Sequence, residues 1–486
     1  MTRVVVIGAG PAGLAAAEAA LEAGAEVTVL DQSDAPGGQY HRTLYGTPHG
    51  FDAVLSRCEW WPESTVWALE AAAPGDPVAA ARAIGDPAAG DPAIATRVAD
   101  GPAGGDAGAG DPAAATRAVS DPAATRRGAG LRLHVLRGPA DGSGRTRHLL
   151  EPDALVLATG AHDRTLPFPG WQLPGVFTAG AAQALAKGER VAVGKRVLVA
   201  GAGPFLLPVT ESLLSVGVDV AAVLETNPAK TVLNGWRFPM RKAGELARYA
   251  ATLARHRVPY LLGRTVVEAR GDVRVREAVT ARVRADWSVV PGTERTYAVD
   301  AVCVGHGFTP QPELAVAAGC VLDGGFVRTD DHQRTSVATV FAAGEITGIG
   351  GADAARAEGA VAGCAAAGGT PSRALLRERD RTRKFAQRLN AAHPIGAAWP
   401  GWLRDDTIVC RCEETTYGDL KSAVDDPVAP GPHALKLGTR AGLGPCQGRM
   451  CGPAVAELCG GAERHHRPIA QPIRLGELAD PKETPA

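Results

Sequence analysis

Residues 4–13 read VVVIGAGPAG, and residues 26–31 read EVTVLD. An apolar run, a glycine-rich turn, an Ala- and Leu-rich stretch and a second apolar run predict strand, turn, helix and strand. In such a unit Gly8 allows the tight turn, Gly10 lets a pyrophosphate approach the backbone, and Gly13 lets helix and strand pack closely. The N-terminal stretch therefore predicts a dinucleotide-binding lobe.

The same pattern returns about 190 residues later, in residues 196–203 (RVLVAGAG) and 220–225 (VAAVLE). Each unit ends its second strand in an acid, Asp31 in the first and Glu225 in the second, where a carboxylate can accept hydrogen bonds from a ribose. Two such units predict an α/β protein with two Rossmann-like lobes.

The second unit departs from the pattern at Leu206, which stands where the first unit has its third glycine. Helix and strand must therefore lie slightly further apart there. Gly201, Gly203 and Glu225 would hold a second adenine nucleotide with an unphosphorylated ribose, either NAD or ATP. The sequence equally allows this lobe to be empty.

Composition and charge exclude several classes of function. Lys and Arg number 51 against 52 Asp and Glu, a net charge of -1, whereas nucleic acid and anionic membranes attract a concentrated positive field. No apolar run approaches the roughly 18 residues of a transmembrane helix, and no signal-peptide core precedes residue 4. We therefore expect a cytoplasmic protein without a nucleic-acid partner or a transmembrane segment.

The composition changes abruptly between Ala71 and Gly130. Ala, Gly, Pro and Asp make up 46 of these 60 residues, so the segment cannot bury enough apolar surface to offset its ordering entropy. Strand-like residues stand on both sides, at 65–69 and 131–136. We expect a flexible low-complexity insertion that expands a hairpin loop and has no function of its own.

Nine cysteines are too few for a disulfide scaffold, but four of them lie in two close pairs near the C-terminus. These are Cys410 with Cys412, and Cys446 with Cys451, in a short stretch that we call the cysteine module (residues 404–465). Four thiolates can ligate iron or zinc. A redox-active dithiol made by the second pair is a further alternative. The other five cysteines are scattered singly and are assigned no role.

Two further stretches, residues 154–160 (ALVLATG) and 340–345 (VFAAGE), are apolar runs ending in small-residue turns. With the N-terminal turn they resemble the glutathione-reductase and thioredoxin-reductase superfamily of flavoproteins, which implies FAD in the first lobe. That family usually has Asp where this chain has Glu345. Residues 35–40 (APGGQY) lack the cysteines of its disulfide reductases, so we disfavour that chemistry.

The resemblance assigns a set of first-lobe residues to FAD. They lie in the glycine-rich turn, at the end of the second strand, in the following loop and in the two small-residue turns. They are Gly8, Gly10, Pro11, Ala12, Gly13, Asp31, Gln32, Gly38, Gln39, Ala158, Thr159, Gly160, Gly344 and Glu345.

In the cysteine module, a Cys-x-Cys pair and a Cys-x4-Cys pair at glycine-rich turns resemble the 2Fe-2S module of bacterioferritin-associated ferredoxins. Cys410, Cys412, Cys446 and Cys451 would be the ligands. The glycines matter because close backbone amides can hydrogen-bond the sulfur atoms of a cluster.

Longer motifs narrow the resemblance to one family. Residues 158–161 (ATGA), 167–171 (PFPGW), 304–308 (VGHGF), 344–351 (GEITGIGG) and 444–453 (GPCQGRMCGP) look like the larger, A-type subunit of heteromeric flavin-dependent amino-acid dehydrogenases. The family includes opine oxidases, hydroxyproline dehydrogenases, hydrogen cyanide synthases and the α-subunit core of sarcosine oxidases. The match covers nearly the whole chain outside the insertion.

This family resemblance implies a domain order. The expected parts are 1–70 and 131–188 (the first part of the FAD domain and the crossover), 71–130 (the insertion), 189–305 (the second nucleotide-binding-like domain), 306–370 (the second part of the FAD domain), 371–403 (a basic linker helix), 404–465 (the 2Fe-2S module) and 466–486 (a tail).

It also implies a role in electron transfer within a complex. The amino acid, imino acid or opine would be oxidised on a smaller flavoprotein subunit. This chain would pass the electrons through FAD and the cluster to an acceptor that the sequence does not name, either in the cytoplasm or at the inner membrane. No catalytic residue is assigned, and His306 is interpreted as a hydrogen-bonded turn residue. The alternatives are a self-contained NADH-dependent flavin reductase and an assembly scaffold.

Overall fold

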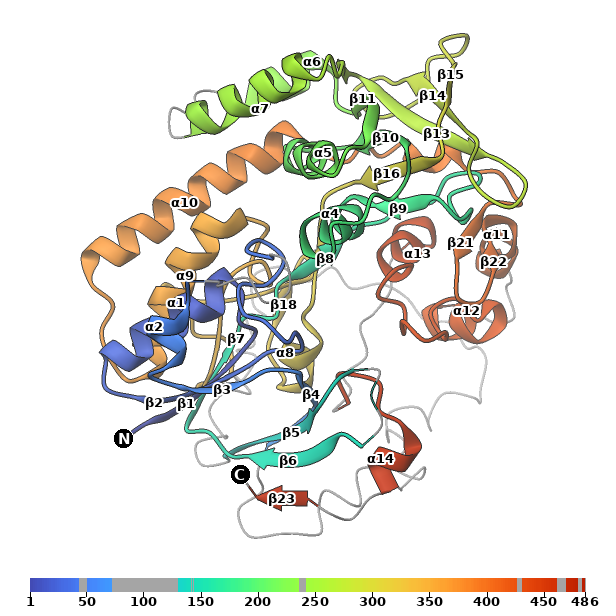
Figure 1. Cartoon of the computed structure of the whole chain (residues 1–486). Helices are drawn as coiled ribbons and strands as arrows, with labels where there is room; N and C mark the ends of the chain where they lie inside the picture. The colour runs from blue at the N-terminus through green and yellow to red at the C-terminus, as the bar shows by residue number, and fades with distance from the viewer. Residues whose placement is uncertain are drawn as a thin grey trace, which may run out of the picture.

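The computed structural model describes residues 1–42, 50–71, 130–140, 142, 144–235, 242–425, 431–460, 469–479 and 483–485. Residues 72–129 of the predicted insertion lie outside the described residues. Figure 1 shows two lobes that each contain a sheet, with a small group of helices from the C-terminal part of the chain (red) beside the second lobe. The predicted α/β class with two Rossmann-like lobes is confirmed.

The first lobe contains five parallel strands in the order β20-β7-β1-β2-β3. Nearly every residue of the central strands is buried, as in a parallel sheet covered on both faces. The carboxyl ends of parallel strands meet at one edge, so the loops that follow them lie together. The strands are β1 (Arg3–Ile7), β2 (Glu26–Leu30), β3 (Glu59–Trp61), β7 (Ala154–Leu157) and β20 (Val340–Ala342).

Two helices of small residues, α1 (Pro11–Glu22) and α9 (Gly351–Ala366), pack together on the first sheet. Their backbones are so close that a Cβ on Gly359 would lie 2.0 Å from the Ala12 carbonyl oxygen. A Cβ on Gly363 would lie 1.9 Å from the Ala16 carbonyl oxygen. The contact therefore requires glycine in α9.

The second lobe repeats the parallel arrangement in the order β12-β11-β10-β16-β9, with a three-stranded antiparallel sheet beside it. Its elements are β9 (Val176–Thr178), α4 (Ala179–Gly188), β10 (Arg196–Gly201), α5 (Leu206–Ser215), β11 (Asp219–Glu225), α6 (Ala229–Gly235), α7 (Ala243–Arg255), β12 (Tyr260–Leu262), β13 (Arg264–Arg270), β14 (Glu277–Arg282), β15 (Arg295–Ala298) and β16 (Ala301–Gly305).

A four-stranded sheet, in the order β23-β6-β5-β4, packs under the first lobe. Strands β4 (Ser64–Ala71) and β5 (Leu131–Arg137) are antiparallel, with Ala71 opposite Leu131. The insertion thus connects neighbouring strands of a hairpin, as the sequence predicts. The other two strands are β6 (Thr146–Leu150) and β23 (Glu483–Pro485).

The C-terminal part begins with α10 (Arg373–Ala392), which starts at the Ser372 cap and runs along α9 (Figure 1). A 3-10 turn, η3 (Trp399–Trp402), then leads to the cysteine module. The module contains β21 (Ile408–Cys410), β22 (Thr415–Thr416), α11 (Tyr417–Val424), α12 (Pro432–Thr439) and α13 (Gly452–Leu458). A buried cluster joins it to the rest of the chain and includes Leu166, Ala202, Trp287, Trp399, Trp402 and Ala454.

The remaining elements are short: α2 (Asp52–Leu55), β8 (Ala161–Asp163), β17 (Phe308–Pro310), α8 (Glu313–Ala317), β18 (Leu322–Asp323), β19 (Phe326–Val327) and α14 (Leu475–Ala479). Strand β8 follows β7 directly and leads toward the second lobe. In the described part of the chain, no helix combines the length and the apolar character needed to cross a membrane.

Replacing Gly363 by Ala should lower the free energy of unfolding by about 1–3 kcal/mol, because the added methyl group overpacks the contact between α9 and α1. Thermal and urea unfolding measure the change. Gly244→Ala in α7 is the matched control: no atom lies within 4 Å of its added Cβ, and Ala is the better helix former. Equal midpoints for the two variants would contradict the prediction.

Candidate functional site

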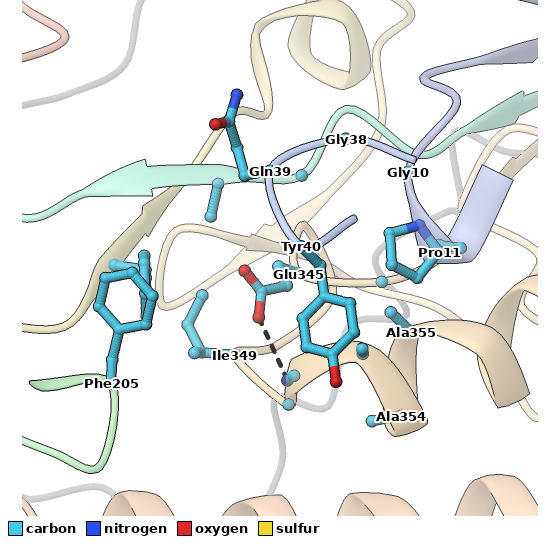
Figure 2. A pocket seen from close by; sticks show the side chains of 18 of the residues that line it. Gly10, Pro11, Gly38, Gln39, Tyr40, Phe205, Glu345, Ile349, Ala354 and Ala355 are labelled. Carbon is cyan, nitrogen blue, oxygen red and sulfur yellow. Dashed lines mark hydrogen bonds between the residues drawn. The ribbon is translucent and has the colours of Figure 1, made fainter. Parts of the chain in front are cut away.

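A cavity of about 1720 Å³ opens at the carboxyl edge of the first sheet and extends to the second lobe and α10. The predicted first-lobe residues line it, with the exception of Gly13, and from the second lobe Gly203 does so as well. Gly201 and Glu225 do not line it. Figure 2 shows Gly10 and Pro11 at the start of α1 on one side of the view and Phe205 of the second lobe on the other.

The glycine-rich turn after β1 makes contacts at two of its glycines that leave no room for a side chain. Gly8 has φ +104°, and a Cβ there would lie 2.3 Å from the Ala158 carbonyl oxygen. A Cβ on Gly13 would lie 1.7 Å from the Gly8 carbonyl oxygen. Gly13 therefore packs α1 against the turn, whereas no atom lies within 4 Å of a Cβ placed on Gly10. The N-terminus of α1 is presented to the cavity, where a pyrophosphate can bind backbone amides.

Asp31 is fixed by backbone donors at the end of β2. Its Oδ2 atom accepts a hydrogen bond from the Ala9 N–H at 2.6 Å, and its Oδ1 atom accepts one from the Ser33 N–H at 2.8 Å. The carboxylate also lines the cavity. Each oxygen accepts one of these bonds and retains a further lone pair, as a ribose acceptor requires.

Two partly buried acids in the cavity wall each accept a hydrogen bond at the start of a helix. Glu345 accepts from the Gly351 N–H of α9 at 3.2 Å (Figure 2), and burial raises the pKa of its carboxyl. Asp163 accepts from the Gly180 N–H of α4 at 2.9 Å, and burial likewise raises its pKa. Asp163 was not among the predicted site residues, although the polar pair His162 and Asp163 directly after residues 158–161 (ATGA) could have indicated it.

The second lobe has the same motif, but its helix begins later after the glycine-rich turn. Helix α1 begins one residue after Gly10, whereas α5 begins three residues after Gly203, at the buried Leu206. A Cβ on Gly201 would lie 1.8 Å from the Gly305 carbonyl oxygen, so this glycine serves the contact between β10 and β16.

Glu225 is fully buried. It accepts hydrogen bonds from the N–H of Gly203 at 2.8 Å and from the backbone and side-chain N–H groups of Asn227 at 2.9 and 3.0 Å. The Nδ1 atom of His393, which follows α10, lies 3.1 Å from Oε2 of Glu225, the oxygen that also accepts from Gly203. The chain itself therefore surrounds the acid that the sequence predicts to hold a ribose.

The four cysteines of the module come together as two neighbouring pairs. Cys412 contacts Cys446, and Cys410 contacts Cys451. None of the four forms a disulfide. Within the described ranges, no three His, Cys, Asp or Glu side chains gather around a point that would hold one metal ion. Paired thiols are the donor set that a two-iron cluster takes, since it binds four cysteines.

The loop between Cys446 and Cys451 directs backbone amides at sulfur. Burial raises the pKa of the Cys446 thiol, but hydrogen bonds from the backbone N–H groups of the loop, led by Met450 and Gly448, and from Cys412 together leave the pKa below its usual value. Gly444, two residues before Cys446, lies close to Cys412: a Cβ on this glycine would lie 2.3 Å from the Cys412 Cβ. Glycine at position 444 thus lets the segment before Cys446 approach Cys412.

Residues 161–165, which we call the bridging segment, connect the cavity to the module. His162 lines the cavity, and its Nε2 atom lies 2.9 Å from the Arg449 carbonyl oxygen. Thr165 donates a hydrogen bond to the Met450 carbonyl at 3.0 Å, and Arg164 pairs with Glu457 of α13. Sequence reasoning missed this segment, because nothing in its composition indicates a contact 287 residues away.

His306 lies outside the cavity. It is buried between Trp287 and Trp402, and neither ring nitrogen has a hydrogen-bond partner among the described residues. Burial, with a contribution from Arg164, lowers its pKa to about 3. His306 lies in the short connection between β16 and β17, and the hydrogen bond expected for it is absent from the described part of the structure.

Comparisons with known protein families agree with this geometry. Residues 133–359 match the pyridine nucleotide-disulphide oxidoreductases, residues 3–100 match the FAD dependent oxidoreductases, and residues 408–459 match the BFD-like 2Fe-2S binding domain. The chain is an oxidoreductase with FAD-binding domains and a 2Fe-2S domain.

Individual relatives match over most of the chain. The A-type subunit of opine oxidase from Agrobacterium tumefaciens is 31% identical, over 98% of this chain and 91% of the relative. The hydrogen cyanide synthase protein HcnB of Pseudomonas aeruginosa is 32% identical, over 63% of this chain and 69% of the relative. The solved L-proline dehydrogenase from P. horikoshii shares the fold, with a TM-score of 0.60 at 17% identity over 99% of this chain and 79% of that one.

His306 should make the folded chain sensitive to mild acid. Its pKa falls from 6.5 to about 3 on folding, so below 6.5 the unfolded chain binds a proton that the folded chain does not. The free energy of unfolding therefore falls as pH drops from 6.5 toward 3, and this contribution is absent above 6.5. His306→Phe should unfold in urea with a smaller difference between about pH 7.5 and about pH 5.5 than the unmodified chain. His256→Phe, at an exposed position, is the control, and an unchanged difference in His306→Phe would contradict the prediction.

Proposed function

This chain belongs to the family of opine oxidase A-type subunits, and on that premise we propose that it is the electron-transfer component of a heteromeric complex that oxidises an amino acid, an imino acid or an opine. FAD would be held in the first-lobe cavity, and the 2Fe-2S cluster would be held by Cys410, Cys412, Cys446 and Cys451. When bound, these two groups supply the electron chemistry that side chains cannot.

The bridging segment carries the proposal. His162 belongs to the cavity wall and also contacts the loop between Cys446 and Cys451. Thr165 contacts the same loop one residue further along. One short, hydrogen-bonded stretch therefore fixes the cysteine loop against the cavity, which is the arrangement that electron exchange between two groups in one chain requires.

Other observations support a division of labour with a second subunit. Among the described cavity residues, Glu345 and Asp163 are acids whose pKa is raised by burial, and each already accepts a hydrogen bond from the first turn of a helix. Their geometry suits holding the loops in place rather than taking a proton from a substrate. We propose that the substrate amine is oxidised on a smaller flavoprotein subunit.

The NADH-dependent flavin reductase is less well supported. Gly203 lines the cavity, but Glu225 is enclosed by Gly203, Asn227 and His393 and so is not presented to a ribose. The later start of α5 also places fewer helix amides at the turn. We propose that the second lobe is mainly structural.

Purified alone, the chain should contain flavin, iron and sulfide, and dithionite should reduce both centres. It should not oxidise amino acids or opines unless the smaller subunit is coexpressed. Visible and EPR spectra with steady-state assays measure these properties. Substrate oxidation by the chain alone would overturn the proposal, and rapid bleaching of the flavin by NADH would favour the reductase.

Replacing Cys446 by Ser should remove the cluster and leave flavin bound, because the cysteine module and the cavity are built from different parts of the chain. The ratio of iron to flavin and the EPR spectrum of the reduced protein measure the effect. Cys459→Ser is the control, since this thiol lies in the same module outside the two pairs. Loss of flavin along with iron would show that the two sites depend on each other.

A further inference from the structure

The side chain of His162 lies at the boundary between the cavity and the cysteine module. It lines the cavity, and its Nε2 atom lies 2.9 Å from the carbonyl oxygen of Arg449. A carbonyl oxygen only accepts hydrogen bonds, so Nε2 carries the hydrogen and donates it. Arg449 stands in the loop between two of the proposed ligands, Cys446 and Cys451.

The contact reaches sulfur through one peptide group. The carbonyl of Arg449 and the N–H of Met450 belong to the same planar amide. That N–H is hydrogen-bonded to the Cys446 sulfur. A donor on the carbonyl oxygen polarises the amide and makes its N–H a stronger donor, because hydrogen bonds in series reinforce one another.

We propose that His162 is a positioning residue that raises the reduction potential of the cluster by polarising the Arg449–Met450 peptide toward Cys446. The inference rests on the proposed function, since it requires the cluster to be present. Hydrogen bonds to ligand sulfurs are one of the factors that set such potentials. They stabilise the reduced cluster, which carries more negative charge, so losing the donor lowers the potential.

The segment around His162 keeps this geometry in place. Arg164 pairs with Glu457 of α13, and Thr165 holds the next carbonyl of the loop, that of Met450. The Arg449 guanidinium donates to the carbonyl of Ala470, which lies outside the module, at 2.8 Å. The loop is thus held by Thr165 and by the Arg449 side chain as well, and its position does not depend on the His162 donor alone.

The test is a potentiometric titration of the full chain with both cofactors bound, following the EPR signal of the reduced cluster and the visible absorbance of the flavin. His162→Phe keeps an aromatic ring and removes the donor. The equilibrium constant for electron transfer from flavin to cluster should fall about three- to tenfold. This corresponds to a reduction potential of the cluster that is lower by about 30–60 mV for a one-electron centre. His162→Gln, whose amide N–H can donate, should restore most of the potential.

Trp171→Phe is the matched control. The Trp171 indole N–H also donates to a module carbonyl, that of Ile408, but the contact lies outside the loop between Cys446 and Cys451. This variant should keep the potential of the unmodified chain. The inference would be overturned if the reduction potential of the cluster were unchanged in His162→Phe. It would also be overturned if that potential fell equally in Trp171→Phe, or if it did not recover in His162→Gln.

Failure of the proposed function has a different signature. It appears in the unmodified chain, as iron-free protein or as flavin and cluster that do not exchange electrons. If His162→Phe does not hold the cluster, His162→Ala and His162→Gln make the same comparison, and equal potentials in these two variants would overturn the inference.

Discussion

The close approach of backbone to backbone around the turn after β1 is the constraint on which the rest of the structure depends. Gly8 lies against Ala158, and Gly13 lies against Gly8, at separations that exclude any Cβ. Gly359 and Gly363 continue the same contact into α9. Together they bring the N-termini of α1 and α9 to one cavity, where backbone amides and helix dipoles favour a negatively charged group.

A comparison of the two lobes shows that the motif alone does not determine whether its acid is available to a ligand. In the first lobe, helix α1 begins beside Gly10 and Asp31 lines the cavity. In the second, Leu206 at the third glycine position delays the helix, and Glu225 is satisfied by Gly203 and Asn227. The same succession of strand, turn, helix and acid therefore yields one lobe with an acid free to meet a ligand and one whose acid is engaged by protein.

The sequence was sufficient for features that depend on local pattern. The two Rossmann-like lobes, the packing role of Gly13 and the hairpin around residues 71–130 follow from periodicity, glycine spacing and composition. The resemblance to a 2Fe-2S module predicted that the four cysteines lie close together. Features that depend on contacts between distant segments could not be predicted: His393 against Glu225, and His162 against Arg449. No local propensity encodes such pairs, because they arise only once the crossover and the linker have packed.

The hairpin of β4 and β5 has a practical consequence. Its base lies near the cavity, where Ser64 and Val66 line the wall, and its other end carries the insertion between the paired residues Ala71 and Leu131. The register of the two strands, not the length of the chain between them, sets the position of those ends. Since closing a longer loop costs little extra entropy, this is a permissive point for grafting an affinity handle or a tether that wires the protein to an electrode.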